Sequence, residues 1–260
     1  MIISIDRISD YKFVATDGEI GKIKEFLFDD EFWTIRYLVV STGSWLNKRN
    51  VLISPYFINN INHGLEEIYV DLTQDQIRNS PDVDSDKPVS RQDEEKYYKY
   101  YGAPEYWGGP YAWGSTSVIN RNREDWKTYK HGESKWNASL RSSKDVTGHK
   151  IQATNENIGD VEDFIIDDEN WTIRYFLVDT GKWLDNKLIL VSPDWIDNIS
   201  WDEKKVFVKV TSEQIRNAPE YDETTGLSRD YEKNLYNYYG MEGYWDSERM
   251  YGDYSRSVHR

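Results

Sequence analysis

The chain of 260 residues contains no cysteine and only four histidines. The absence of cysteine excludes disulfides, thiolate metal ligands and cysteine nucleophiles. The histidines are scattered, show no paired spacing, and none recurs in the internal repeat described below: His63, His131, His149 and His259. Metal-binding helix motifs, glycine-rich phosphate loops and nucleophile-elbow motifs are also absent. We therefore expect a protein that is not an enzyme and uses no cofactor.

Long apolar runs are missing as well. No stretch approaches the roughly 18 apolar residues that a membrane-spanning helix needs. The first residues, MIISIDRISDYK, carry acids where a secretory signal would be apolar. Together with the lack of cysteine, these features predict a cytoplasmic protein with no membrane span.

Positive charge is in short supply. The formal net charge is −14 and the sequence pI is about 4.8. An acidic excess of this size opposes contact with phosphate backbones, so nucleic acid is not the expected partner. A basic protein surface suits this charge better.

The chain does contain an internal duplication. FLFDDEFWTIRYLVVSTGSWL recurs 138 positions later as FIIDDENWTIRYFLVDTGKWL. The offset then holds for about ninety residues, down to Tyr106-Trp107 and Tyr244-Trp245. We predict repeat 1 at 1–107 with its β-domain at about 3–80, and repeat 2 at 141–245 with its β-domain at about 141–218. Residues 108–140 are the expected linker, and 246–260 a loosely ordered tail.

Each repeat begins with strand patterns. Residues 20–28 alternate apolar and polar, Asp29-Asp30-Glu31 marks a turn, and residues 33–40 are rich in aromatic and β-branched residues. This pattern is typical of a β-hairpin. Short strands are also predicted at 12–15, 51–54 and 68–72. Several short strands with frequent turns predict a mainly β fold of two small antiparallel barrels or sandwiches.

Helical signals follow the strands. Thr73 and Gln76, like Thr211 and Gln214, have the spacing of a capping box. A second helix is predicted in each repeat, at 91–101 and 229–239. Each ends in Tyr-Tyr-Gly and continues into an extension rich in tyrosine and tryptophan.

The β part of each repeat resembles a PRC-barrel domain. The resemblance lies in Gly21-x-Ile-x-x-Phe-x-Phe-Asp29, Ile35-x-Tyr-Leu-Val-Val40, Thr42-Gly43 and Val51-Leu-Ile-Ser-Pro55, and in the matching segments of repeat 2. This barrel occurs in the photosynthetic reaction-centre H subunit and in the ribosome maturation factor RimM. The resemblance implies two small β-barrels that act through protein contacts, as assembly or scaffold modules, with no catalytic residues. A duplicated unit often reuses the interface of a homodimer, so we expect an internal pseudo-dimer; a homo-oligomer is the alternative.

Three repeated features could carry binding. Asp29-Asp30 and Asp167-Asp168 could bind calcium, although Asp is also a common turn residue, which is the reading we favour. Arg36 and Arg174 lie inside apolar strands and could anchor a partner carboxylate or pair with an acid of the chain. Tyr106, Trp107, Tyr244 and Trp245 could form a protein-binding surface, stack on sugars, or pack on their own barrel. We predict a non-catalytic protein-interaction module, with carbohydrate or small-ligand binding as the alternative.

Overall fold

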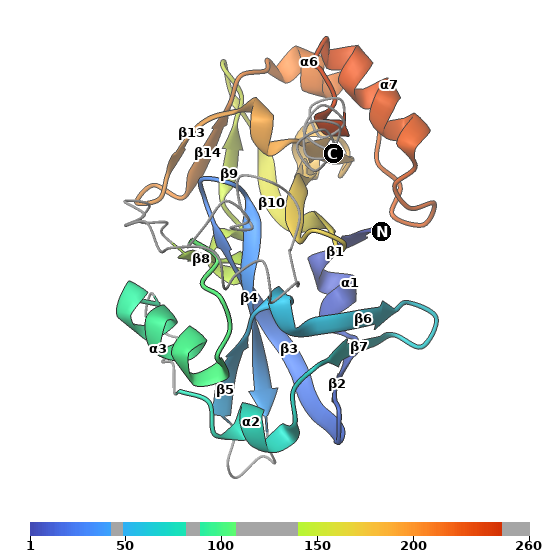
Figure 1. The fold of residues 1–260 in the computed structure, drawn as a ribbon. Coiled ribbons are helices and arrows are strands. Elements are labelled where there is room, and N and C mark those ends of the chain that lie inside the picture. Colours follow the sequence, from blue (N-terminus) through green and yellow to red (C-terminus); the bar gives the residue numbers. More distant parts are fainter. Residues whose placement is uncertain (43–48, 82–88, 108–139, 246–260) are drawn as a thin grey trace, which may run out of the picture. The chain divides into compact units, whose positions relative to one another are not determined.

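A computed structural model describes residues 1–42, 49–81, 89–107 and 140–245 (Figure 1). Of the predicted linker at 108–140, residues 108–139 lie outside the described residues, as does the predicted tail at 246–260; Leu140 already belongs to the first strand of repeat 2. The fold is mainly β, as expected. No helix within the described ranges is long and apolar enough to cross a membrane.

Repeat 1 contributes seven strands and three helices to the described part of the chain. In order they are β1 (Ile2–Ser4), α1 (Ile5–Ser9), β2 (Lys12–Ala15), β3 (Gly18–Asp29), β4 (Thr34–Thr42), β5 (Arg49–Ile53), β6 (Ile58–Asn62), β7 (Glu67–Val70), α2 (Gln74–Arg78) and α3 (Arg91–Tyr101). The 3-10 turn η1 (Pro55–Phe57) precedes β6. The predicted hairpin at 20–40 is confirmed as β3 and β4, which pair antiparallel.

Repeat 2 has the same order. Its elements are β8 (Leu140–Ser142), α5 (Ser143–Val146), β9 (Lys150–Gln152), β10 (Asn157–Asp167), β11 (Thr172–Asp179), η2 (Gly181–Leu184), β12 (Leu188–Val191), η3 (Pro193–Trp195), β13 (Ile196–Ser200), β14 (Lys205–Val208), α6 (Ser212–Arg216) and α7 (Arg229–Tyr239). The sequence analysis did not predict the short elements α1, α5, β6 and β13.

Two details of the predicted fold class need correction. The strands pair in an open path, β13-β14-β9-β10-β11-β4-β3-β2-β7-β6, and not in closed rings. The pairing is also not purely antiparallel, since β2 pairs parallel with β7 and β9 pairs parallel with β14. A parallel pair needs a crossover connection. Strands β3 to β6 supply that crossover in repeat 1, and local sequence patterns do not reveal strand direction.

Helix boundaries follow the local signals closely. Thr73 and Thr211 each form a complete capping box, which confirms the first predicted helix of each repeat. The second helices span the predicted ranges, with Ser90 and Ser228 as N-caps. They end at Gly102 and Gly240, whose φ values of 61° and 66° suit a residue without a Cβ.

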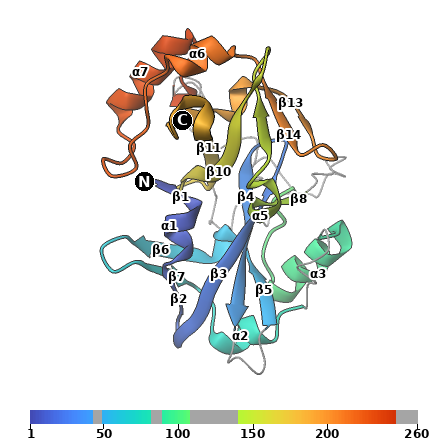
Figure 2. The same cartoon turned by 180° about the vertical axis from the view of Figure 1, so that it is seen from behind.

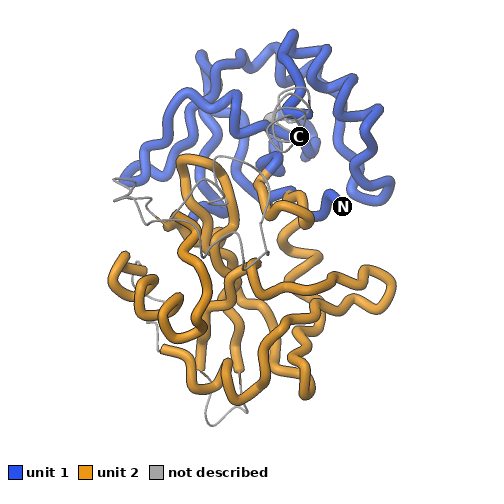
Figure 3. The backbone as a smooth tube through the Cα atoms, viewed as in Figure 1, with its two compact units in different colours: residues 1–3, 146–165, 174–260 blue, residues 4–145, 166–173 orange. Residues whose placement is uncertain are grey.

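The described chain divides into two compact units whose membership differs from the repeats at short segments (Figure 3). Unit 2 contains residues 4–145, which hold most of repeat 1, and also 166–173 from repeat 2. Unit 1 contains the remainder of repeat 2 together with residues 1–3. Accordingly, β8 pairs with β3 inside unit 2, whereas β1 pairs with β10 (Figure 2). The first strand of each repeat thus pairs with a hairpin strand of the other repeat.

Candidate functional site

A β-bulge determines the position of Arg36 in repeat 1. Leu27 pairs with Tyr37 and Phe28 pairs with Ile35, which leaves Arg36 as the extra residue on β4. Simple alternation predicts that Arg36 and Tyr37 lie on opposite faces. A bulge re-aims a side chain. The two instead converge, with the Arg36 guanidinium 4.4 Å and the Tyr37 ring 6.4 Å from the ring centre of Tyr106.

Asp29, the last residue of β3 and the first of the acidic turn, forms an ion pair with Arg36. Arg36 Nε donates to Asp29 Oδ2 at 2.6 Å, and both side chains are fully buried. Asp29 Oδ1 accepts a hydrogen bond from the Phe32 amide at 2.6 Å, as expected of a turn aspartate. Burial raises the pKa of Asp29, although the charge of Arg36 acts to lower it.

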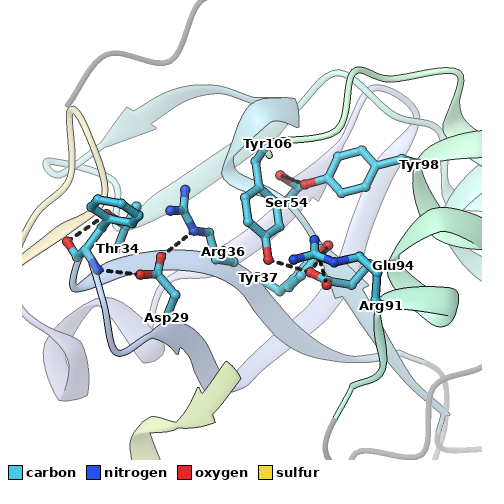
Figure 4. Close-up of polar contacts among 10 residues, drawn as sticks. Asp29, Thr34, Arg36, Tyr37, Ser54, Arg91, Glu94, Tyr98 and Tyr106 are labelled. Atoms are coloured by element: carbon cyan, nitrogen blue, oxygen red, sulfur yellow. Dashed lines mark hydrogen bonds and ion pairs between the residues drawn. The ribbon is translucent and has the colours of Figure 1, made fainter. Parts of the chain in front are cut away.

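Glu94 of α3 is the centre of a buried hydrogen-bond network (Figure 4). Its Oε1 accepts hydrogen bonds from Tyr106 at 2.7 Å and from Tyr37 at 3.0 Å. Its Oε2 lies 3.2 Å from Nη1 of Arg91, and the Glu94 side chain is 2% exposed. Burial raises the pKa of Glu94 more than Tyr106 and Arg91 lower it. This one carboxylate joins α3, the aromatic extension and β4.

The aromatic extension continues the network through cation–π contacts. Arg91 lies 3.8 Å from the ring centre of Trp107 and 5.7 Å from that of Tyr106. Tyr106 is 2% exposed, whereas Trp107 is half-buried. Stacking on a sugar requires an exposed ring face, which Tyr106 does not offer. The position of Tyr106 agrees with packing of the extension on the strands of its own repeat.

Repeat 2 builds the same network within unit 1. Tyr175 and Tyr244 both donate to Glu232 Oε1 at 2.8 Å, and Arg229 lies 3.0 Å from Glu232 Oε2. Arg174 stacks on Tyr244 at 3.9 Å. Arg229 lies 4.7 Å from the half-buried ring of Trp245. Every one of these residues lies 138 positions after its counterpart.

The other aspartates of the acidic turns bind groups of the chain. Asp30 pairs with Arg141 at 2.9 Å, and Asp168 pairs with His63 Nε2 at 2.7 Å. Asp167 Oδ1 accepts from the Glu169 amide at 3.2 Å. No group of three or more metal-ligating side chains occurs among the residues that the structure describes.

The role of His63 is a feature that the sequence did not predict. The Tyr11 hydroxyl lies 3.1 Å from Nδ1 of His63, and the two rings pack edge to face at 5.8 Å. In repeat 2, His149 is the counterpart of Tyr11 and Trp201 is the counterpart of His63. Their rings also pack edge to face, at 6.0 Å. Each repeat therefore carries a histidine–aromatic pair, with the histidine in the opposite position. A search for histidines at equivalent positions cannot find such an exchange; a search for equivalent pairs could.

Comparison with known families decides the identity. A family model for the PRC-barrel domain matches residues 3–77 and again residues 141–215. The chain belongs to the PRC-barrel family. None of the curated proteins compared with it matches.

The networks around Glu94 and Glu232 are formed largely outside the two matched PRC-barrel segments. Arg36 and Tyr37 belong to the first matched segment, whereas Glu94 and Tyr106 follow it. The aromatic extension is therefore attached to the PRC-barrel repeat by buried charge. Removing one member of such a network leaves another buried polar group without its partner.

Proposed function

We propose that this tandem PRC-barrel protein is a non-catalytic interaction or scaffold protein that binds a basic protein partner. The observation that carries the proposal is that the buried ionisable groups of both repeats bind other side chains of the same chain. Arg36 is bound to Asp29, and Glu94 and Glu232 are each bound to two tyrosines and an arginine. These side chains hold the aromatic extensions against the strands of the repeats. A partner would then be recognised by the surface.

Charge supports a basic partner. The chain has a net charge of −14, and exposed acids occur on and after helix α6, at Glu213, Glu220 and Glu223. Charge complementarity steers association and selects partners more than it adds affinity. Binding should therefore weaken as salt is added, because screening acts most strongly on exposed charges.

The proposal can be tested by affinity capture with matched charge variants. The full chain, immobilised, is expected to retain a specific set of proteins with net positive charge from a lysate of the source organism. Quantitative mass spectrometry would compare it with the Glu213→Gln/Glu220→Gln/Glu223→Gln variant. We expect that variant to retain less of the same proteins, and to lose less of its binding when salt is added.

A variant with the opposite change in charge is the control. Lys12, Lys22 and Lys24 are exposed on β2 and β3, and their replacement by Gln makes the chain more acidic. This control should retain the partners at least as well as the natural chain. Equal capture by the natural chain and both variants would contradict recognition by charge. Turnover of a small-molecule substrate by the purified chain would contradict a non-catalytic role.

A further inference from the structure

Two reciprocal hydrogen bonds join the repeats inside unit 2. The Ile35 amide donates to the Trp171 carbonyl at 2.7 Å, and the Ile173 amide donates to the Trp33 carbonyl, also at 2.7 Å. Between them, Thr34 of β4 faces Thr172 of β11. Moving each residue to its counterpart 138 positions away turns one bond into the other. Such reciprocity is the mark of a self-complementary interface, in which the same surface is used twice.

The two tryptophans have an unusual backbone. Trp33 has φ 53° and Trp171 has φ 60°, in the left-handed region that bulky residues rarely adopt. A conformation of this kind is unfavourable for a residue with a bulky side chain and persists only where the surroundings enforce it. In both cases the carbonyl of the strained residue accepts the reciprocal bond. The strain therefore occurs in both repeats at the position that makes the pairing.

Side chains of repeat 1 form a binding surface for the hairpin tip 166–173 of repeat 2. Trp171 is 1% exposed and stacks on Phe26 with a ring separation of 6.5 Å. Asp168, whose side chain is 5% exposed, pairs with His63, which also contacts Tyr11. The tip is thus held by a buried ring and by the contact of Asp168 with His63, in addition to its backbone bonds.

The first strand of repeat 2 completes the same surface. Strand β8 pairs with residues 27–29 of β3, Arg141 pairs with Asp30, and Ser143 Oγ accepts from the Phe26 amide at 3.2 Å. The counterpart of β8 is β1, which pairs with β10. Each repeat therefore supplies a strand that pairs with the hairpin of the other repeat.

We propose that this hairpin-tip surface, residues 25–36, is a self-pairing interface whose partner is another copy of the repeat, and that it acts without a covalent connection between the copies. Segments 140–143 and 166–173 of repeat 2 contact this surface in the structure, and they identify the repeat as its binding partner. The inference does not depend on which outside protein the chain binds.

The test begins with the full chain carrying a specific protease site inserted between residues 120 and 121. After cleavage, light scattering coupled to size-exclusion chromatography is expected to show one species with the mass of the intact chain, 30.8 kDa. Two separate species of about half that mass would overturn the proposal. The uncleaved chain serves as the mass reference.

Cysteine pairing then tests the geometry, since the natural chain has no cysteine. Thr34 and Thr172 form a pair flanked by the reciprocal bonds, for which the Cα separation is about 4.5 Å. That spacing suits a disulfide. The cleaved Thr34→Cys/Thr172→Cys chain should therefore become covalently joined on oxidation. In the control Ser41→Cys/Thr172→Cys, the first cysteine is moved seven residues along β4, about 23 Å, and should not join. Equal joining of both pairs, or of neither, would overturn the proposed register.

The affinity between the cleaved halves tests the side-chain contacts of the hairpin tip. Asp168→Asn removes the carboxylate that lies 2.7 Å from His63 Nε2 and is expected to raise the dissociation constant about tenfold. Glu169→Gln changes an exposed acid in the same turn and should leave the constant within about twofold. Anisotropy of one labelled half, measured during dilution of the cleaved protein, gives both values. An equal effect of the two substitutions would show that the halves associate through a different surface.

Discussion

Trp171 offers a sharp test of the strained hairpin tip. The side chain is 1% exposed and packs on Phe26, so its removal should cost about 3–5 kcal/mol of stability. Its φ of 60° adds a second effect that depends on what replaces it. A residue with a Cβ costs about 1–2 kcal/mol in the left-handed conformation, and glycine does not.

The comparison of Trp171→Ala with Trp171→Gly separates the two effects. At an ordinary position glycine is less stable than alanine by about 0.5–1 kcal/mol, because it loses more backbone freedom on folding. At position 171 the relief of strain should cancel or reverse this order. The glycine variant is therefore expected to be as stable as the alanine variant, or more stable by up to about 1 kcal/mol.

Trp195 is the matched control. It is also 1% exposed and packs against Tyr236 and Tyr239, but it lies in η3 with a negative φ. There Trp195→Gly should be less stable than Trp195→Ala. Urea unfolding followed by far-UV circular dichroism gives the four values without relying on tryptophan fluorescence. The same order of alanine and glycine at both positions would refute the argument that the backbone at Trp171 is strained.

Three further predictions concern repeat 1. Because burial raises the pKa of Glu94, the natural chain should gain stability relative to Glu94→Gln as pH falls from the raised value towards the ordinary 4.5; a pH-independent difference in urea unfolding would contradict this. Tyr97→Phe removes the hydroxyl that accepts the Ser54 amide at 2.8 Å in a buried site, and should cost about 1–3 kcal/mol in the same assay. Gly21→Ala would place a Cβ against a backbone carbonyl of β4 and should cost about 1–3 kcal/mol, whereas Gly64→Ala has room and should change the melting temperature little.

Local features of the fold could be read from the sequence because their causes are local. The Thr73 capping box is formed by residues three positions apart, and the hairpin of β3 and β4 depends on alternation around one acidic turn. The helix at 91–101 is bounded by Ser90 and Gly102, which satisfy its terminal amides and carbonyls. Each signal lies within a few residues of the structure that it predicts.

The candidate site was only partly predictable. Arg36 and Tyr106 were identified because they recur, but their common contact depends on the bulge in β4. Glu94 was not identified, because an acid in a charged helix has the appearance of a solvated residue. His63 was dismissed as unrepeated, and only its contacts with Tyr11 and Asp168 give it a role.

The sequence by itself determined the duplication, the family resemblance and most helix and strand boundaries, since these follow from matching positions and short-range chemistry. Only the tertiary structure decided which strands pair. Strand exchange between the repeats, the parallel pair of β2 with β7 and the reciprocal bonds beside Thr34 and Thr172 all join residues that are 55 or more positions apart. Either repeat could supply an equivalent strand, because their sequences are so alike. The choice depends on packing and chain connection, and no local pattern records it.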